Sequence, residues 1–457
     1  MERPHALVLP LPLQGHVIPL LELSNRLVER GFKVTFVNTE LNHARITSAM
    51  SNSSCDMNQI HFVTVPDGIE EGDDPSDLVR KREGLRRVLP ASLEELIKKS
   101  NMVEDHKFTC FIVDVFMAST LDVAKKAGLH TVIFYPGGLG TLLIGSSIPK
   151  LIADGIIDEQ GEVKTKGKFQ INLEMPSMET ADLPWQCFPD VKTKHHMFKF
   201  SLNVGTTINT EELILCNSFF GLENGKSILP PNILLIGPLL ANQELKKPKG
   251  YLWEENTSCI TWLDKQLPNS VIYIAFGSYT MFDHCQFEEL ALGLELSDKR
   301  FLWVVRPGLS RDEDVGFLAR FRSRVEGRGM IVRWAPQQQV LAHCSIACFM
   351  SHCGWNSTLE GLANGVPFLC WPYFADQFIS QGYICDIWKT GLRMNLDGNK
   401  VVSRKEIKRK VEELMGDEEM KIRAMQLKAR ADKSVNKGGH SFENFNCFVS
   451  RMNTSVH

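Results

Sequence analysis

The chain has 457 residues, of which 43% are hydrophobic, 23% charged and 9% aromatic. These proportions are typical of a globular protein and exclude a disordered, fibrous or low-complexity chain, while the length suits two large α/β domains. The 51 Lys and Arg residues against 54 Asp and Glu give a net charge of −3. So weak a net charge offers no electrostatic footprint for nucleic acid or an anionic membrane, so we do not expect sequence-independent phosphate binding.

The cysteines and the apolar segments predict a cytoplasmic protein. The 12 cysteines are scattered, with no CxxC pair and no Cys/His spacing that suits zinc, which is typical of free thiols in a reducing compartment. The apolar run at residues 6–13 is short and contains Pro10 and Pro12, unlike the core of a signal peptide. No run of 18 apolar residues occurs, so we expect no membrane span.

The N-terminal half alternates predicted strands and helices. Apolar runs at residues 7–9 and 33–37 flank a segment of helical periodicity, which predicts a β-α-β unit. The pattern returns with a buried run at 110–114, a helix over 121–127 and a strand over 131–134. Repeated units of this kind predict a parallel sheet with helices on both faces and with ligands beyond the carboxyl ends of the strands.

The C-terminal half restarts the alternation after a polar segment that contains Pro and Gly. Strands at 271–278 and 300–305 flank a helix over 287–296, so a second doubly wound sheet follows. The last segment is amphipathic and carries three Phe residues that need a groove, so we expect it to return to the first domain. The predicted organisation is an N-terminal domain over 1–240, a linker over 241–250, a C-terminal domain over 251–437 and a C-terminal helix over 438–457.

Residues 334–377 hold the densest set of polar and aromatic side chains. An apolar strand at 346–350 leads through a turn into a helix near residue 357. The unpaired N–H groups and the macrodipole of a helix N-terminus attract anions, and a diphosphate has the charge that suits such a site. The alternative is that one of these polar side chains only caps the helix. The residues that line this turn are His352, Gly354, Asn356 and Ser357.

The same stretch resembles the signature box of the plant family 1 UDP-sugar glycosyltransferases. Similar motifs follow in the order of that family at residues 15–16, 113–116, 182–184, 217–219, 262–264, 276–278 and 439–441. The resemblance covers essentially the whole chain. It implies a GT-B fold, in which two Rossmann-like domains face each other across a cleft, and it implies UDP-glucose as co-substrate with no bound cofactor.

The resemblance also implies roles for the donor-site residues. Trp334 is expected to stack on uracil, with the Ala335 backbone at the base edge and Gln337 near the ribose. Glu360 resembles the ribose ligand, because one carboxylate can accept both vicinal hydroxyl protons. If Trp334 and Trp355 are considered one at a time, each is more often a packing residue than a ligand. The expected diphosphate ligands are Ser278, His352, Asn356 and Ser357 beside Gly354, and the expected sugar ligands are Trp355, Asp376 and Gln377. Gln at the last position resembles glucose users, whereas galactose users tend to carry His.

His16 and Asp114 are the predicted catalytic pair. His16 follows the first strand and begins the next helix, and Asp114 ends another strand of the same sheet. A carboxylate there can hold one ring nitrogen of the histidine and stabilise the imidazolium that forms when the other removes a proton. The alternative is a His that satisfies a buried turn and an Asp that caps a helix.

The mechanism implied is one in-line displacement that inverts the anomeric carbon. The negative charge that develops on UDP meets the helix N-terminus and His352, so we expect no metal requirement. The DxD pattern that metal-dependent glycosyltransferases use occurs once, at residues 312–314 in a charged loop, and we expect no metal there.

The acceptor is expected to be a small lipophilic plant metabolite, phenolic, flavonoid or terpenoid. Pro136 aligns with a position where many relatives carry a Thr that touches the sugar, and proline cannot donate that hydrogen bond. Any of the apolar candidates could instead be core. The candidate pocket residues are Phe116, Met117, Pro136, Leu139, Trp185, Phe198, Phe200 and Phe374.

Three other functions compete with this prediction. An NAD(P)-dependent oxidoreductase would need a GxGxxG motif after the first strand, where residues 11–15 contain a single glycine. A hydrolase would need a nucleophile, and no GxSxG motif occurs. A non-catalytic UDP-sugar or metabolite sensor stays open as the alternative, because donor binding does not prove transfer. A monomer is the default expectation.

Overall fold

The computed structural model describes residues 3–44, 60–69, 78–103, 106–223, 230–240, 255–306, 309 and 314–453. The predicted linker, 241–250, lies outside these residues. The chain divides into two compact units, each with its own sheet. Unit 1 comprises Met1–Thr165, Phe188–Trp253 and Ser434–His457, and unit 2 comprises Lys166–Cys187 and Glu254–Lys433.

Unit 1 is built on a seven-stranded sheet in which every neighbouring pair is parallel. Strands β1 and β4 are buried along their whole length, as expected of a parallel sheet covered on both faces. Their apolar runs lack the polar alternation of a half-exposed strand. In sheet order the strands are β3 (Ile60–Val65), β2 (Lys33–Thr39), β1 (His5–Leu9), β4 (Cys110–Asp114), β5 (His130–Tyr135), β8 (Leu213–Cys216) and β9 (Ile233–Leu235).

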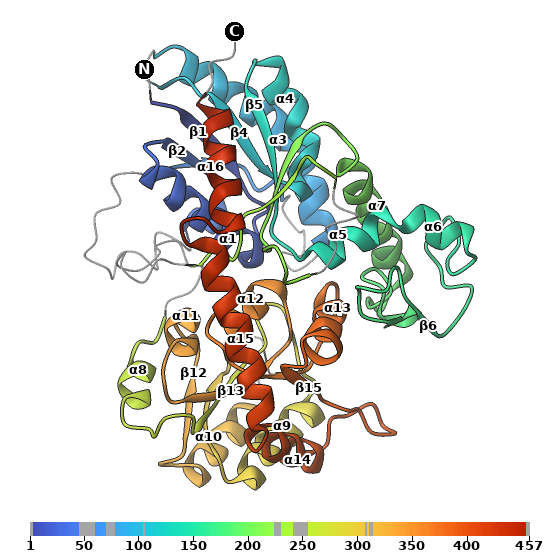
Figure 1. Ribbon diagram of the computed structural model, residues 1–457, viewed down its shortest axis with the longest axis vertical. Coiled ribbons are helices and arrows are strands. Elements are labelled where there is room, and N and C mark those ends of the chain that lie inside the picture. Colours follow the sequence, from blue (N-terminus) through green and yellow to red (C-terminus); the bar gives the residue numbers. More distant parts are fainter. Residues whose placement is uncertain are drawn as a thin grey trace. The chain divides into compact units, whose positions relative to one another are not determined.

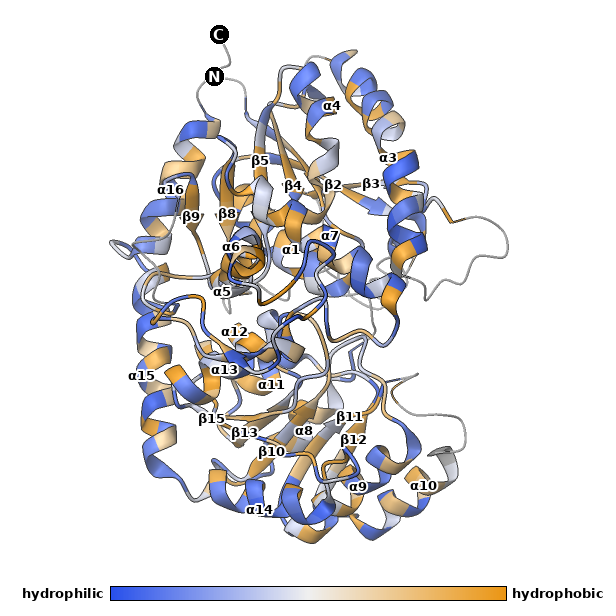
Figure 2. Ribbon diagram, turned by 90° about the vertical axis from the view of Figure 1, so that its right-hand side faces the viewer, coloured by the Kyte–Doolittle hydropathy of each residue, from blue (hydrophilic) through white to orange (hydrophobic). Residues whose placement is uncertain are grey.

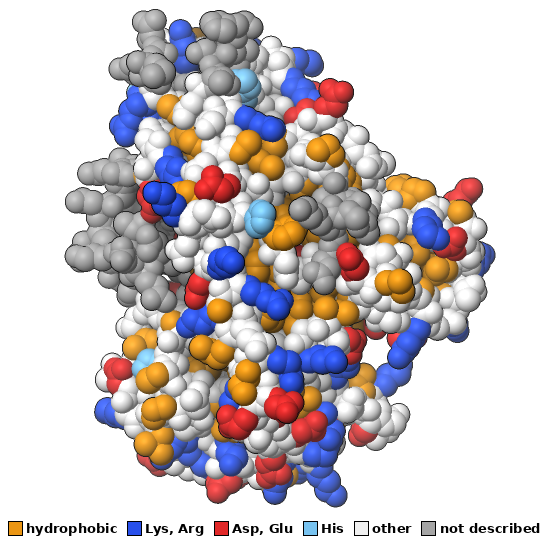
Figure 3. All heavy atoms as spheres, viewed as in Figure 1, with side chains coloured by type: hydrophobic (Ala, Val, Ile, Leu, Met, Phe, Trp, Pro, Cys, Tyr) orange, Lys and Arg blue, Asp and Glu red, His pale blue; other side chains and the backbone are white. Residues whose placement is uncertain are grey.

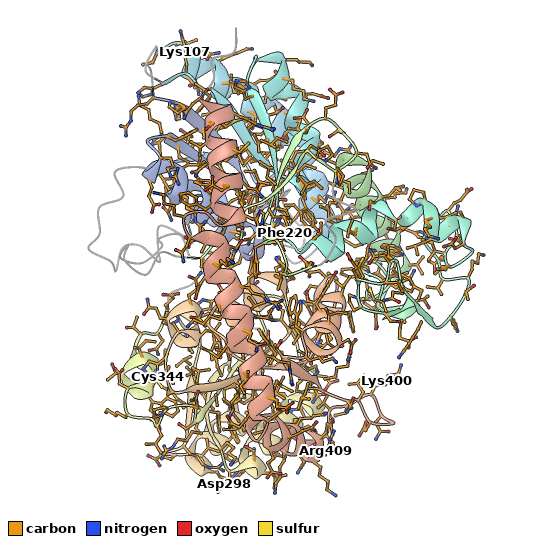
Figure 4. The ribbon with its side chains drawn as sticks, in the orientation of Figure 1. Lys107, Phe220, Asp298, Cys344, Lys400 and Arg409 are labelled. Carbon is orange, nitrogen blue, oxygen red and sulfur yellow. The ribbon has the colours of Figure 1, made fainter. Side chains whose placement is uncertain are left out.

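Helices surround this sheet, and the last helix of the chain is one of them (Figure 1). Phe445, Phe448 and Val449 of α16 join the apolar cluster of β1, β2 and α1. Near the start of α16, the ring of His440 lies 4.5 Å from that of Phe220. Figure 4 labels Phe220. The helices of unit 1 are α1 (Gln14–Glu29), α3 (Leu78–Asn101), the short 3₁₀ helix η2 (Val115–Thr120), α4 (Leu121–Lys126), α5 (Leu139–Ser146), α6 (Ile148–Ala153), α7 (Val191–Thr207) and α16 (His440–Met452).

Unit 2 repeats the architecture with a six-stranded sheet, again parallel throughout. Figure 2 shows the apolar character of β10 and β13 against the hydrophilic residues of α14. In sheet order the strands are β12 (Gly329–Val332), β11 (Arg300–Val304), β10 (Val271–Ala275), β13 (Ile346–Ser351), β14 (Phe368–Cys370) and β15 (Gly391–Arg393).

Helix α14 of unit 2 begins at a side-chain cap. Ser403 caps α14 by accepting a hydrogen bond from the backbone N–H of Glu406. Acidic and basic side chains are interspersed over α14 and α15 (Figure 3), so these helices present a mixed, solvated surface. The helices are α8 (Ser258–Leu263), α9 (His284–Ser297), α10 (Asp314–Arg324), α11 (Gln337–Leu341), α12 (Trp355–Ala363), α13 (Gln377–Gly382), the π-helical turn η4 (Tyr383–Ile387), α14 (Arg404–Met415) and α15 (Glu418–Val435), whose last residues fall in unit 1.

Residues 166–187 belong to unit 2, although the predicted boundary put them in the N-terminal domain. They form the antiparallel pair β6 (Lys168–Phe169) and β7 (Met178–Glu179), followed by the 3₁₀ turn η3 (Thr180–Asp182). The reason is packing: Pro176 lies directly over Gly382 of α13. This excursion was not predictable from the alternation of strands and helices, because it is a contact made far from its place in the chain.

The strand order reverses direction once in each sheet. In unit 1 the reversal lies between β1 and β4, and in unit 2 it lies between β10 and β13. Loops diverge at such a point and leave a crevice beyond the carboxyl ends of the two strands, where open α/β sheets bind their ligands. In the part of the chain that the structure describes, no helix has the length and apolar character needed to cross a membrane.

Candidate active site

His16 and Asp114 meet at the reversal point of the unit 1 sheet. His16 is in the first turn of α1, after β1, and Asp114 is the last residue of β4. The Nδ1 atom of His16 lies 2.7 Å from Oδ2 of Asp114, whose side chain is fully buried while that of His16 is 17% exposed. Because Nδ1 is used by the carboxylate, Nε2 is the ring nitrogen left to exchange a proton.

A second hydrogen bond fixes the Asp114 carboxylate. Its Oδ1 atom accepts from the backbone N–H of Phe116 at 2.9 Å and so caps the helix η2. The predicted alternative, an Asp that caps a helix, is therefore true of one oxygen, and the other oxygen still holds the histidine. Both oxygens are occupied, which restricts the rotation of the carboxylate and orients the imidazole.

Aromatic side chains pack beside the His16–Asp114 pair. The ring of Phe116 contacts His16 edge-on at 4.6 Å between centroids, and Phe200 of α7 stacks on Phe116 at 4.1 Å. Of the other predicted pocket residues, Met117, Pro136, Leu139 and Phe198 are buried in unit 1, whereas Trp185 and Phe374 belong to unit 2. Trp185 is only 1% exposed, so it is packed like a core residue.

Glu223 is a positioning residue that the sequence analysis missed. Its buried carboxylate accepts hydrogen bonds from the backbone N–H groups of Leu139 and Gly140 and from the hydroxyl of Ser218, all at 2.7–2.8 Å. It therefore supplies the N-terminal cap of α5, which has no capping side chain of its own. Burial raises the pKa of Glu223, against the effect of these three donors. No local sequence pattern predicts this cap, because Glu223 lies more than 80 residues from the start of α5.

In unit 2 the predicted donor residues all follow the carboxyl ends of strands. Ser278 follows β10, Trp334, Ala335 and Gln337 follow β12, the His352–Glu360 stretch follows β13, and Asp376 and Gln377 follow β14. Strand order places these loops along one edge of the sheet. The structure therefore brings the predicted donor residues to a common edge, as a ligand-binding crevice requires.

His352 is enclosed by two glycines at the reversal point of this sheet. A Cβ atom on Gly277 would lie 2.6 Å from Nε2 of His352, and one on Gly354 would lie 2.5 Å away. Gly277 also has φ +67°, a conformation that favours glycine. Burial, with a smaller effect of the Arg306 charge, lowers the pKa of His352 to about 4. The imidazole is thus neutral at pH 7 and offers a hydrogen bond but no charge.

The start of α12 lies beside this histidine. Gly354 is the N-cap and makes no side-chain capping bond, and Asn356 and Ser357 are in the first turn. The alternative in which one of the two polar side chains caps the helix is not seen at the cap position. Arg306, which sequence analysis also missed, donates from Nε to the carbonyl of Gly277 at 3.1 Å and so supports the loop that faces the helix start.

Glu360 lies among amide donors. The Nε2 atom of Gln337 donates to Glu360 Oε2 at 2.6 Å and to Ser357 Oγ at 2.8 Å, and Gln338 donates to Oε1 at 3.2 Å. The hydroxyl of Tyr273 donates to Oε1 of Gln337 at 3.1 Å. Burial is the main effect on the carboxyl group and raises the pKa of Glu360 to about 7, although both amides favour the ionised form.

Gln377 is held by its carbonyl oxygen. Its Oε1 atom accepts from the backbone N–H groups of Tyr373 and Phe374 at 2.7 and 3.1 Å, and the side chain is buried. This arrangement assigns the amide nitrogen as the group available to a ligand.

Trp355 is buried, with its ring 6.5 Å from that of Trp388. The acidic residues 312–313 lie outside the described residues, and the expectation of no metal stays a prediction.

Comparison with known proteins identifies the class. The family model described as "UDP-glucoronosyl and UDP-glucosyl transferase" matches residues 185–436. UDP-glycosyltransferase 83A1 of Arabidopsis thaliana is 41% identical, over 100% of this chain and 98% of that protein. The chain therefore belongs to the UDP-glycosyltransferase family and is an enzyme of that class.

Solved structures agree with this assignment. A UDP-glucosyltransferase from Polygonum tinctorium, described as capable of glucosylating indoxyl, is 28% identical with a TM-score of 0.83, and 99% of each chain is covered. Os79 from O. sativa in complex with UDP is 27% identical with a TM-score of 0.79, over 98% of this chain and all of that chain. The fold is accordingly GT-B, with two Rossmann-like domains, as predicted.

Proposed function

We propose that this enzyme transfers glucose from UDP-glucose to a hydroxyl group of a small, largely apolar metabolite, with inversion at the anomeric carbon. Unit 2 binds the donor and unit 1 binds the acceptor. The observation that carries the proposal is the 2.7 Å contact of His16 Nδ1 with the buried Asp114, which leaves Nε2 to remove a proton. The glucosylating relative from Polygonum tinctorium supports glucose and a small acceptor.

The reaction is a single displacement. The acceptor hydroxyl gives its proton to His16 Nε2 while its oxygen forms a bond to the anomeric carbon. The bond from that carbon to the β-phosphate oxygen breaks, and its electron pair leaves with UDP. Asp114 stabilises the imidazolium. The N–H groups at the start of α12 stabilise the charge on UDP without a metal ion, and neutral His352 adds one hydrogen bond.

Paired variants of the two catalytic residues test the base assignment. His16→Ala should lower kcat at least about 1,000-fold, within the range that loss of a general base gives. The dissociation constant for UDP should stay within about twofold, because the donor residues are in unit 2. Asp114→Asn should lower kcat less, since the base is kept but poorly oriented. Unchanged turnover of a weakly acidic alcohol by His16→Ala would refute the assignment.

The donor sugar depends on Gln377. Its amide nitrogen is the group available to a sugar hydroxyl, because Oε1 is occupied by two backbone N–H groups. We expect Gln377→His to weaken the use of UDP-glucose, measured as kcat/KM. Equal kcat/KM of the parent enzyme for UDP-glucose and UDP-galactose would contradict the assigned role.

A further inference from the structure

Positive charge is concentrated on two helices of unit 1, in a chain whose net charge is −3. Helix α7 contains three lysines and no Asp or Glu. Both α3 and α7 pack against η2, which carries Phe116 next to His16. Between residues 79 and 87 of α3, a single acidic residue, Glu83, stands among Arg80, Lys81, Arg82, Arg86 and Arg87. The electrostatic surroundings of the predicted acceptor pocket therefore favour an anion.

Arg82 contacts one of the predicted pocket residues, Phe200. The guanidinium carbon of Arg82 lies 3.9 Å from the centroid of the Phe200 ring, a close cation–π contact. Phe200 in turn stacks on Phe116, and Phe116 contacts His16. A continuous series of contacts thus joins the guanidinium to the proposed catalytic base. The two stacked rings, of which Phe116 is half-buried and Phe200 buried, link His16 at one end to the cation at the other.

The guanidinium lacks a carboxylate partner in the described part of the chain. Its polar contact there is a distant one, with Nε2 of His196 at 3.5 Å. Burial lowers the pKa of Arg82 to about 10, with a further lowering by Arg86 and an opposing effect of the Asp114 charge. Arg82 is still a cation at pH 7. A partly desolvated cation that makes no salt bridge is costly, and a bound anion would lower that cost.

We propose that Arg82 binds a carboxylate of the acceptor, so that the acceptor is a hydroxy acid with an aromatic or aliphatic apolar body. This inference rests on the proposed transfer to a hydroxyl group. A guanidinium that is stacked by one face still has N–H donors at its edge, and their planar fork matches both oxygens of a carboxylate. The apolar body then lies beside the half-buried Phe116, with the hydroxyl at His16.

The carboxylate is a handle and takes no part in the chemistry. The hydroxyl proton goes to His16, the oxygen forms the bond to the anomeric carbon, and UDP leaves with the electron pair of the broken bond. The product is a glucoside whose carboxylate is intact. Binding at two points fixes which hydroxyl reaches the base.

Matched acceptors test this assignment. We would compare 4-hydroxycinnamic acid and 12-hydroxydodecanoic acid with their methyl esters, which keep the hydroxyl and remove only the charge. The parent enzyme should prefer each acid by about tenfold or more in kcat/KM, the preference that about 1.4 kcal/mol of ion pairing gives. Arg82→Gln should bring the acid-to-ester ratio close to one through a higher KM for the acid, and Arg82→Lys should keep part of the preference.

Two controls separate binding from structural effects. Arg86→Gln removes an exposed, solvent-screened cation from the same helix and should change the acid-to-ester ratio by no more than about twofold. Thermal unfolding of each variant reports whether unit 1 is folded. In the products of the two free acids, mild alkali should leave the bond to glucose intact, because glucosides resist it, whereas a glucose ester would be cleaved.

Several results would overturn the proposal. These are a parent enzyme that does not prefer the acids, an Arg82→Gln variant that loses acid and ester activity equally, or an alkali-labile product, which would place the carboxylate at the base. Transfer to a neutral alcohol but to none of the four probes would also overturn it and would leave the proposed function intact. Transfer to no acceptor at all would refute the proposed function itself.

Discussion

Asp114 shows how one residue serves both the fold and the site. Its two oxygens have different partners, the imidazole of His16 and the backbone N–H of Phe116. Removing the carboxylate therefore removes a helix cap as well as the hydrogen bond that orients His16, the proposed base. For Asp114 variants, both the activity and the free energy of unfolding have to be measured, because the loss of the cap can lower stability. The His16→Ala variant keeps the cap and therefore tests the chemical role of His16 alone.

At the residue scale, the raised pKa of Glu360 gives a pH prediction. An ionised carboxylate can accept both ribose hydroxyls, and with a pKa of about 7 the group is protonated below neutral pH. We expect the affinity for uridine to fall about tenfold from pH 8 to pH 6. Uridine is chosen over UDP because it carries no phosphate that titrates in this range.

The matched variant is Glu360→Gln, which keeps the shape and cannot ionise. Its affinity should be lower than that of the parent at pH 8 and nearly independent of pH, as measured by calorimetric titration. A parent enzyme with the same uridine affinity at both pH values would show that Glu360 does not bind the ribose in its ionised form.

The placement of the candidate site residues could largely be predicted, because they follow strand ends. Residues after parallel strands gather at one edge whatever the loop details are, so His16 and Asp114 could be paired, as could the loops that carry His352 and Gln377. The packing of individual side chains could not be predicted, because strand order does not fix rotamers or loop conformations. The enclosure of His352 by Gly277 and the stacking of Arg82 on Phe200 are of this kind.

At the scale of elements, α5 and α7 depend on a close backbone approach. A Cβ atom on Gly205 of α7 would lie 2.2 Å from the carbonyl oxygen of Gly145 on α5. Gly205→Ala must therefore push the two helices apart, at a cost of about 1–3 kcal/mol in the free energy of unfolding. Because α7 also carries Phe200, the KM for the acceptor should rise more than the KM for UDP-glucose.

Gly316→Ala is the matched control. This glycine is in α10, and the nearest atom to a new Cβ would be 3.7 Å away, so the alanine should not lower stability. Urea unfolding of both variants measures the difference. Equal stability of the Gly205→Ala variant and the parent would mean that the two helices can separate freely.

The elements themselves were largely predictable, and their ends were less so. The predicted strand 110–114 has the bounds of β4, whereas the helix expected to begin near residue 357 begins at Trp355. The earlier start follows from Gly354, whose backbone forms the cap and lets the helix begin directly after the turn. Hydrophobic periodicity indicates the apolar face of a helix, but it does not predict a first turn that is stabilised by the backbone.

At the scale of the whole molecule, the end of the chain completes the core at its beginning. Phe448 of α16 is fully buried in the cluster that contains β1 and α1. Phe448→Ala should lower the free energy of unfolding of unit 1 by about 3–5 kcal/mol, the usual cost of removing a buried Phe side chain.

Ser450→Ala, on the exposed face of the same helix, should change that free energy by no more than about 0.5 kcal/mol. Urea unfolding with a probe in unit 1 compares the two variants. If Phe448→Ala were as stable as Ser450→Ala, α16 would contribute nothing to the core of unit 1.

The central claim concerns the reaction of the whole enzyme: inverting, metal-independent transfer of glucose. The most direct measurement incubates the purified protein with UDP-glucose, a chelator and a panel of phenolic, terpenoid and hydroxy-acid acceptors. Mass spectrometry detects the product, and the NMR coupling of the anomeric proton gives its configuration. We expect a mass gain of one hexose in the β configuration from the α-linked donor, lost in His16→Ala. Tight UDP binding without any product would instead indicate a sensor, and an α-linked product would contradict the displacement mechanism.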